Sequence, residues 1–506
     1  MFFKKMFRII VLFVLIFLLF GLLGNASEVK ELKVAFGQEI VTFDTHNYRG
    51  TQDEIAAYLI YETLVTFDKN QNIVPKLATS WKQIDPFTWE FKLREGVKFH
   101  DGTPFNAEAV KFSIERCTAG GGEAFTGFIK EVEIIDDYTV IFHLKKEYGP
   151  ILESLTVVVG GMMNPKFVEE KGENIVQYAN GTGPFILKEF SPGIRTVFIK
   201  NKDYWGEPAK LEKIEFRAIP EEGTRVMALR SGEVDVIENP SPNDIPSLER
   251  DKNLYVYVSP KDRTLFVGFN LKDENVGTEK NKALREAIAY AIDKKSIVDF
   301  VLEGLGVQAD TGFIPQSISK GFHDPNLVRE MNIEKAKAIL KDAGIEEGRE
   351  IEFTVTRGRY LKDTAIAEVI QEQISKIGLK AKIEVMEFGP FTSYLSKFQG
   401  EMFLLAWGWG NGEPQVALHA LFHSEGVRNR NAFYDKEFDV LLDKAVATVD
   451  FKERMKLYNQ AYKIIFDQVA IIPLLHYQNV FSANKKVKGL YADPGEMVHF
   501  EEMYVE

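Results

Sequence analysis

The chain has 506 residues and a formal net charge of −12 at pH 7. It is therefore too long for a single hydrophobic core, and its charge has the wrong sign for binding nucleic acid or an anionic membrane surface. Its composition, 45% hydrophobic and 27% charged, is that of a packed globular protein, and its single cysteine, Cys117, excludes a disulfide within one chain.

The first 26 residues have the pattern of a secretory signal peptide. Three basic residues precede an apolar run over 9–20, and the small residues Gly24 and Ala26 predict cleavage after Ala26. An uncleaved anchor is the alternative, although the run is slightly short for a membrane span. No cysteine directly follows the run to carry a lipid, so we expect a free periplasmic protein. Loss of the three cations changes its net charge from −12 to −15.

The residues up to about 240 predict strands interleaved with helices. The Asp101-Gly102-Thr103-Pro104 turn leads into a helix, because Gly tolerates positive φ and Pro presets the first helical turn. Helices are also expected at 52–64 and from 221 to a stop at Gly232. Strands are expected at 32–36, 89–93, 132–135, 139–144, 185–190, 195–200, 212–219 and 234–237.

The second half of the chain repeats this alternation and predicts a second α/β lobe. A helix at 281–302 places its apolar residues on one stripe, and a β-α-β unit over 350–385 has Gly378 as its helix stop. The tail from 487 to 506 is expected to close the first lobe. The remaining strands are expected at 265–271 and 471–481, and the remaining helices at 436–448 and 451–467.

Several short sequence segments identify a family resemblance. The chain contains YETL at 61–64, GVKFHDGTPF at 96–105, GTGPF at 181–185, KNKDYWG at 200–206 and ALRSGEVDV at 228–236. These segments resemble those of the bacterial extracellular solute-binding proteins of the dipeptide, oligopeptide and nickel class, which are the capture components of ABC importers.

This resemblance implies an α/β fold of the two-lobed periplasmic binding protein kind, with a ligand cleft between the lobes. After a signal peptide over 1–26, we expect lobe I, with an extra subdomain, over 27–268 and lobe II over 269–475. Residues 476–506 would return to lobe I. Strands near 265–271 and 473–483 would cross between the lobes.

The stretch 403–410, FLLAWGWG, is the strongest site candidate. Alternate residues of a strand share a face, so Phe403, Leu405, Trp407 and Trp409 form one row. We expect the first two in the core. Trp407 and Trp409 stand at the glycine-rich strand end, where ligands bind in open α/β sheets. In the resembling class, a Trp at the position of Trp407 lines the ligand cavity.

One position departs from the pattern of the peptide binders in that class. They carry an Asp three residues after this Trp, which holds the ammonium group of the peptide, whereas this chain has Gly410 there. A buried ammonium without an anion is costly, so the departure argues against free peptides. Glu413 is a candidate replacement.

Two further pairs are candidate ligand contacts. The resemblance implies an Arg near Arg357 and Arg359 that clamps the ligand carboxylate, an interaction worth roughly 1.5 to 3 kcal/mol. Either residue fits, and the alternative interpretation is two solvated surface charges. Tyr48 and Arg49 lie on the loop before the first helix and would face the cleft.

The sequence offers little for catalysis or metal binding. His419 and His423 lie four residues apart on a predicted helix and are either a metal pair or a structural pair. The chain has no G-x-S-x-G, H-E-x-x-H or phosphate-loop motif, and the S-x-x-K match at 317–320 lacks its companion motifs. We expect no enzyme activity, no cofactor and no metal.

The sequence therefore predicts a monomeric, extracytoplasmic substrate-binding component of an ABC importer. It would capture short peptides or peptide-like solutes in the interlobe cleft and deliver them to the membrane permease subunits. Oligosaccharides, favoured by the Trp row and Gly410, and a metal chelate are alternative ligands. An exported enzyme on the same fold is the alternative from a different class.

Overall fold

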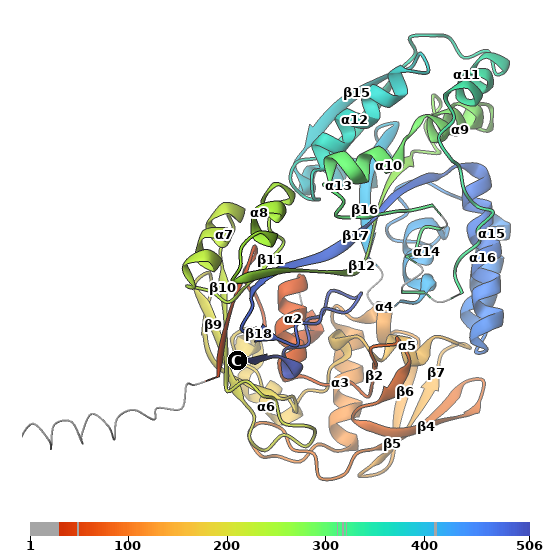
Figure 1. Ribbon diagram of the computed structural model, residues 1–506. Helices are drawn as coiled ribbons and strands as arrows, with labels where there is room; N and C mark the ends of the chain where they lie inside the picture. The colour runs from red at the N-terminus through yellow and green to blue at the C-terminus, as the bar shows by residue number, and fades with distance from the viewer. Residues whose placement is uncertain (1–29, 48–49, 311, 316–317, 320, 409–411) are drawn as a thin grey trace, which may run out of the picture.

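The computed structural model describes residues 30–506 except 48–49, 311, 316–317, 320 and 409–411. Two α/β lobes are joined by strands β12 (Leu254–Phe269) and β17 (Ile471–Asn484), which run side by side and antiparallel between them (Figure 1). The predicted fold class is confirmed. The predicted signal peptide lies outside the described residues. None of the helices within the described ranges is long and apolar enough to cross a bilayer.

One sheet extends through both lobes, in the order β15-β14-β16-β12-β17-β11-β1-β10-β9-β8, with β13 paired to β17. Its lobe II strands are β14 (Glu350–Thr356), β15 (Lys380–Met386) and β16 (Met402–Gly408). Its lobe I strands are β1 (Glu31–Phe36), β8 (Phe185–Ser191), β9 (Arg195–Lys200), β10 (Lys213–Ala218) and β11 (Val236–Glu238), and the short β13 spans Val307–Gln308.

Lobe I also contains a separate four-stranded sheet in the order β4-β5-β7-β6. Its strands are β4 (Ala78–Asp85), β5 (Thr88–Leu93), β6 (Ile129–Asp136) and β7 (Thr139–Leu144). Short strands complete the lobe: β2 (Val65–Phe67), β3 (Ile73–Pro75), β18 (Val487–Lys488) and β19 (Tyr504–Val505). Its helices are α2 (Thr51–Ile60), α3 (Ala107–Ala119), α4 (Glu123–Thr126), α5 (Ile151–Ser154), α6 (Pro165–Lys171), α7 (Glu222–Ser231) and α8 (Ile245–Glu249).

The helices of lobe II cover its part of the large sheet and form a pair, α15 and α16, at the right edge of Figure 1. They are α9 (Lys282–Ala291), α10 (Lys294–Ser296), α11 (Ile333–Asp342), α12 (Asp363–Ser375), α13 (Phe388–Ser396), α14 (Pro414–Phe422), α15 (Lys436–Ala447) and α16 (Phe451–Gln468). The strands predicted at 139–144, 195–200 and 350–356 coincide with β7, β9 and β14, so these predictions are confirmed.

The helix predicted at 52–64 is too long, because α2 ends at Ile60 and Tyr61 has extended backbone angles (φ −105°, ψ 146°). Neighbouring segments form hydrogen bonds with this part of the chain instead. The Ile60 carbonyl accepts a hydrogen bond from the Gly183 amide (2.8 Å), and the Glu62 carbonyl accepts one from Met162 (2.8 Å). Tertiary hydrogen bonds therefore replace the last helical turn.

The side chain of Glu62 explains why three of the recognised sequence segments occur together. Its buried carboxylate accepts hydrogen bonds from the Thr182 hydroxyl of GTGPF (2.7 Å) and from the Tyr204 hydroxyl and Trp205 indole of KNKDYWG (2.7 Å each). Lys76 adds an ion pair at 3.0 Å. These segments therefore build the scaffold of lobe I around one buried anion.

Two further boundary predictions are corrected. The helix predicted at 281–302 breaks at Ile292, because the Asp293 side chain accepts from the Ser296 amide and starts a new helix there. The strand predicted at 265–271 begins earlier, at Leu254. The lobe boundaries predicted after residues 268 and 475 stay predictions, and both positions fall inside strands, β12 and β17, that continue across them.

Candidate functional site

A cavity of about 530 Å³ lies between the lobes, at the end of strand β16. Lobe II contributes β16, α13 and the loops after β14 and α14, whereas lobe I contributes α2 and α4 and the crossing strand β12 adds a third side. The aromatic part of the lining consists of Phe125, Tyr360, Phe388, Phe391 and Trp407. A recess between lobes that combines an aromatic surface with polar groups is typical of small-molecule sites.

A second hollow of about 740 Å³ adjoins the first. The two share lining residues from both lobes, which are Gly50, Thr51, Arg263, Arg359, Tyr360 and Glu496. The space between the lobes is therefore larger than the cavity at Trp407 alone.

Trp407 lies where the sequence predicts it, at the end of β16 and in the cavity wall. Phe403 and Leu405, earlier on the strand, are buried. The indole nitrogen of Trp407 is buried and has no hydrogen-bond partner among the described residues. An indole N–H usually finds an acceptor when it is buried, so this donor suits a ligand oxygen. Trp409 and Gly410 lie outside the described residues.

Arg359 stands on a loop that one carboxylate holds in place. Asp363 accepts hydrogen bonds from the amides of Gly358 (3.1 Å), Arg359 (3.0 Å) and Tyr360 (3.2 Å). The guanidinium of Arg359 lies 4.5 Å from the ring centre of Phe388 and lines the cavity. Arg357 is exposed and is not among the lining residues. Of the two candidates, Arg359 is thus the one beside the cavity.

Two arginines that the sequence reasoning missed, Arg428 and Arg430, also line the cavity. The residue between them, Asn429, holds their loop through its side chain. Its Nδ2 donates to the Phe433 backbone carbonyl (2.6 Å), and its Oδ1 accepts from the Phe433 backbone amide (2.9 Å). Burial and the neighbouring charge of Arg428 both lower the pKa of Arg430. The alternation Arg-Asn-Arg at 428–430 is the only sequence signal for the pair, and it is weak.

A β-bulge shapes the opposite side of the cavity. Pro260 pairs with Gln478 and Thr264 with His476, so three residues of β12, 261–263, face a single residue of β17. Of these three, Lys261 and Arg263 form ion pairs with the buried Glu496 at 2.8 and 3.0 Å. Burial alone would raise the pKa of Glu496, but Arg263 and Lys261 hold it well below its usual value.

Asp262, the middle residue of this bulge, is buried and lines the cavity. A Cβ atom placed on Gly408 would lie only 3.2 Å from its Oδ1 atom, so the Asp262 carboxylate sits against the strand end that carries Trp407. Glu54 of α2 also lines the cavity. Burial raises the pKa of Glu54 to about 8, and the charges of Asp262 and Glu496 add to the shift.

Glu413 does not lie where the sequence reasoning needs it. Its side chain is only 1% exposed and pairs with Arg454 at 2.9 Å, and it is not among the residues that line the cavity. This ion pair engages the carboxylate and argues against a role as the anion for a ligand ammonium. Tyr48 and Arg49, the candidates from lobe I, lie outside the described residues.

His419 and His423 stack their rings, with centres 4.5 Å apart and an interplanar angle of 9°. The nearest carboxylate oxygens to His423 Nε2 belong to Asp439 and Asp443, at 3.7 and 3.8 Å. Within the described ranges, no group of three or more His, Cys, Asp or Glu residues is arranged to hold a metal ion. The two imidazole rings are therefore better described as a stacked pair than as two ligands of one metal ion.

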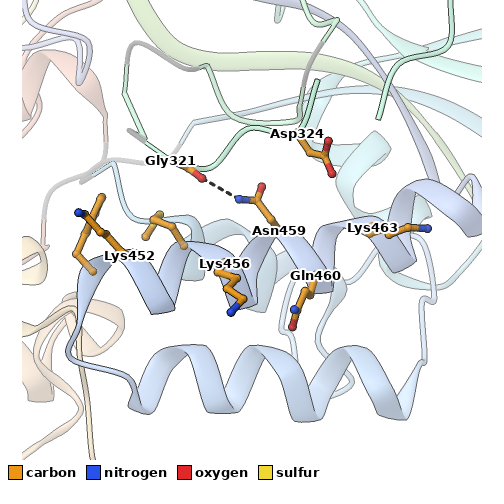
Figure 2. A pocket seen from close by; sticks show the side chains of 9 residues that line it. Gly321, Asp324, Lys452, Lys456, Asn459, Gln460 and Lys463 are labelled. Atoms are coloured by element: carbon orange, nitrogen blue, oxygen red, sulfur yellow. Dashed lines mark hydrogen bonds between the residues drawn. The ribbon is translucent and has the colours of Figure 1, made fainter. Parts of the chain in front are cut away.

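A third hollow, of about 390 Å³, lies on α16 (Figure 2) and shares no lining residue with the Trp407 cavity. Asn459 donates a hydrogen bond to the Gly321 carbonyl across it at 2.8 Å. Its cations, Lys452, Lys456 and Lys463, come from one helix. All residues that line this groove belong to lobe II, so the groove does not lie between the lobes.

The chain is similar to known proteins along nearly its whole length. Residues 72–429 match the family described as bacterial extracellular solute-binding proteins, family 5 Middle. The chain is 29% identical over 491 residues to the dipeptide-binding protein of Escherichia coli K12, with 90% of this chain and 91% of that protein covered. It is 30% identical over 505 residues to the glutathione-binding protein GsiB of the same strain, with 94% and 95% covered.

A solved structure shows the same architecture. The periplasmic binding protein DppA from Helicobacter pylori, in complex with the peptide STSA, superimposes with a TM-score of 0.78 at 28% identity. The match covers 94% of this chain and 98% of that one.

Proposed function

This chain belongs to the bacterial extracellular solute-binding proteins of family 5, and on that premise we propose that its ligands are short peptides or peptide-like solutes, captured in the cavity beside Trp407. It delivers them to the permease subunits of an ABC importer. The two relatives from Escherichia coli carry dipeptide-binding and glutathione-binding names, and the solved relative holds a peptide.

The observation that carries this proposal is the position of Trp407 and Arg359 in one interlobe cavity. The ring of Trp407 offers a flat apolar surface and an indole N–H without a partner among the described residues. The guanidinium of Arg359 offers paired donors that match a carboxylate. Because lobe I supplies Glu54 to the same cavity, a bound solute contacts both lobes and stabilises the closed form.

The charged lining favours a peptide over an oligosaccharide. A neutral sugar uses the Trp407 surface but leaves the guanidinium groups of Arg359, Arg428 and Arg430 without an anion. A peptide carboxylate satisfies at least one of them. The absence of an acidic residue at position 410 then requires another anion for the peptide ammonium.

The cellular setting follows the family, whose members are extracytoplasmic binding proteins. We expect this chain to work in the periplasm as a monomer, after removal of residues 1–26, and to bind its solute without converting it. An exported enzyme would need a nucleophile, base or metal in the cavity, and the described lining residues offer no such constellation.

A thermal-shift screen of the mature chain, residues 27–506, tests the proposal. Three panels are compared: short peptides, oligosaccharides, and Ni²⁺ with and without chelators. A ligand at a hundredfold excess over its Kd stabilises the folded state by about 2.7 kcal/mol. A rise in melting temperature with peptides alone supports peptide capture, and a rise with sugars alone overturns it. Mass spectrometry of the recovered ligand detects turnover.

A further inference from the structure

We propose that the preferred solute is an acidic zwitterion with two carboxylates and one amino group, such as a short peptide with an acidic side chain. Its carboxylates contact the guanidinium groups on the lobe II side of the cavity, and its amino group contacts Glu54 and Asp262 on the opposite side. This inference rests on the function proposed above and specifies the ligand of that same site.

The lobe II side of the cavity carries more positive charge than one carboxylate requires. Arg359 comes from the loop after β14, and Arg428 and Arg430 come from the segment after α14. None of the three forms an ion pair with a carboxylate in the part of the chain that the structure describes, whereas Arg263 is paired with Glu496 at 3.0 Å. Since no carboxylate of the described residues lies within ion-pair distance of these three cations, a ligand with two carboxylates matches them better than a neutral peptide does.

The loop of Arg428 and Arg430 is built to hold two like charges together. Asn429 is buried and ties the loop to Phe433 through two hydrogen bonds. Arg430 is partly buried beside the charge of Arg428. Two neighbouring guanidinium groups repel each other, and a bound anion between them removes that repulsion and adds charge-assisted hydrogen bonds.

The opposite side of the cavity carries the carboxylates. Glu54 comes from α2 of lobe I, and Asp262 comes from the bulge of β12. The Asp262 carboxylate lies against Gly408, the last residue of β16. The anion that peptide binders carry after β16 is therefore supplied here from the neighbouring strand. Glu54 adds a second carboxylate that the ammonium of a ligand would keep ionised.

Apart from the ion pair of Arg263 with Glu496, the cations of the lining come from lobe II and the carboxylates come from α2 and the crossing strand. A zwitterion lying across the cavity places its amino group toward lobe I and the crossing strand, and its carboxylates toward lobe II. Such a ligand connects the two lobes by ionic contacts at both ends, whereas a neutral sugar or an N-blocked peptide lacks one or both contacts. Charge complementarity and closure of the cleft then favour the same ligand.

Isothermal titration calorimetry of the mature chain with Ala-Glu, Ala-Gln and N-acetyl-Ala-Glu tests the inference. Ala-Gln has the shape of Ala-Glu with one carboxylate fewer, and acetylation removes only the amino group. We expect Ala-Glu to bind at least about tenfold more tightly than either analogue, since each lost charge-assisted contact is worth about that factor.

Two double variants test which side chains bind the carboxylate end and the amino end of the ligand. Arg428→Gln with Arg430→Gln is expected to weaken Ala-Glu by about tenfold or more and to leave Ala-Gln within about twofold. Glu54→Gln with Asp262→Asn is expected to weaken Ala-Glu but to leave N-acetyl-Ala-Glu unchanged. The control is Lys452→Gln in the groove on α16, which neutralises a cation outside the cleft. Circular dichroism checks that each variant is folded.

The outcomes separate the two proposals. Equal affinity for Ala-Glu and Ala-Gln, or equal losses for both in the arginine variant, overturns the acidic ligand while peptide capture stands. Unchanged binding of Ala-Glu to the Glu54 and Asp262 variant overturns the assignment of the amino group. Failure of all three peptides and of the wider peptide panel overturns peptide capture itself, and the present inference with it.

Discussion

Arg454 of α16 and Glu153 of α5 form an ion pair across the two lobes, with Nη2 and Oε1 2.7 Å apart. The same guanidinium donates from Nε to Glu413 at 2.9 Å, shortly after the strand that carries Trp407. The Arg454 and Glu413 side chains are only 2% and 1% exposed, so they interact with little solvent screening. Glu413 of lobe II is therefore linked to Glu153 of lobe I through one buried cation.

We predict that Glu153→Ala favours the open cleft and weakens ligand binding by about tenfold, because a charge-assisted hydrogen bond across the lobes is worth roughly 1.5 to 3 kcal/mol. Calorimetry measures the affinity, and small-angle scattering measures the size of the ligand-free protein. The exposed Glu147→Ala, in the same segment, is the control. An unchanged affinity would mean that the Arg454–Glu153 ion pair does not stabilise the closed form.

The Glu62 carboxylate is expected to be a major determinant of the stability of lobe I. Glu62→Ala leaves Lys76 and the donors of Thr182, Tyr204 and Trp205 without their acceptor. Removing one partner of a buried ionic network costs about 3 to 5 kcal/mol. Urea unfolding of the variant and of the exposed control Glu95→Ala measures the difference. Similar midpoints for both variants would contradict this role.

Glu54 is expected to make stability depend on pH. Its pKa is raised from an ordinary 4.5 to about 8 in the folded protein by burial and by the charges of Asp262, Glu496 and Asp493, with Arg263 opposing. Between these two values the folded state binds more protons than the unfolded state. The contribution of Glu54 is therefore present below about pH 4.5 and is lost as pH rises toward 8, by at most about 1.4 kcal/mol per pH unit.

Melting temperatures of the ligand-free protein from pH 5 to pH 8 measure this effect. We expect Glu54→Gln to flatten the decline, so that the variant exceeds the unmodified protein in melting temperature at pH 8 and approaches it at pH 5. The exposed Glu169→Gln on α6 is the control. Parallel curves for Glu54→Gln and the unmodified protein would exclude the raised pKa.

The cavity predicts different effects for the two arginines after β14. Arg359→Gln is expected to weaken an acidic ligand by about tenfold or more, since it removes a charge-assisted contact. Arg357→Gln, on the same loop but outside the lining, serves as the matched control and is expected to leave affinity unchanged. Calorimetry with one acidic dipeptide compares them. Equal losses would place both guanidinium groups at the ligand.

Trp407→Ala removes the flat surface of the cavity and an indole donor. We expect a loss of roughly 1 to 3 kcal/mol in binding for any ligand class. The same calorimetric titration measures the loss, and Trp81→Ala, at a strand of the separate lobe I sheet, is the control for losing a large ring. An unaltered Kd for Trp407→Ala would remove this cavity from consideration as the ligand site.

Local pattern and recognised sequence segments predict much of the fold. Period-two strands such as β9 and β14 follow from side-chain alternation alone, and α7 ends at Gly232, whose φ of 75° favours a residue without a Cβ atom. The end of α2 does not follow from local pattern. It depends on hydrogen bonds from Met162 and Gly183, which only the tertiary fold brings close.

The site is less predictable for the same reason. Trp407 stands in a recognisable sequence context. Asp262 enters the cavity because of a bulge, and nothing in the sequence of β12 predicts that bulge. Arg428 and Arg430 have no local pattern that marks a site, and only the fold brings them into one cavity lining with Glu54. The sequence suggests Glu413 as a ligand contact, because its actual partner, Arg454, lies in a helix far along the chain.

The pairing of β11 and β12 with β17 sets the order in which the protein can mature. The central strand of the sheet that joins the lobes belongs to the last part of the chain, so neither lobe is complete until nearly all residues have been synthesised. Pairings between distant segments form slowly. We therefore expect the two lobes to be joined only after β17 has been synthesised and has paired with β11 and β12.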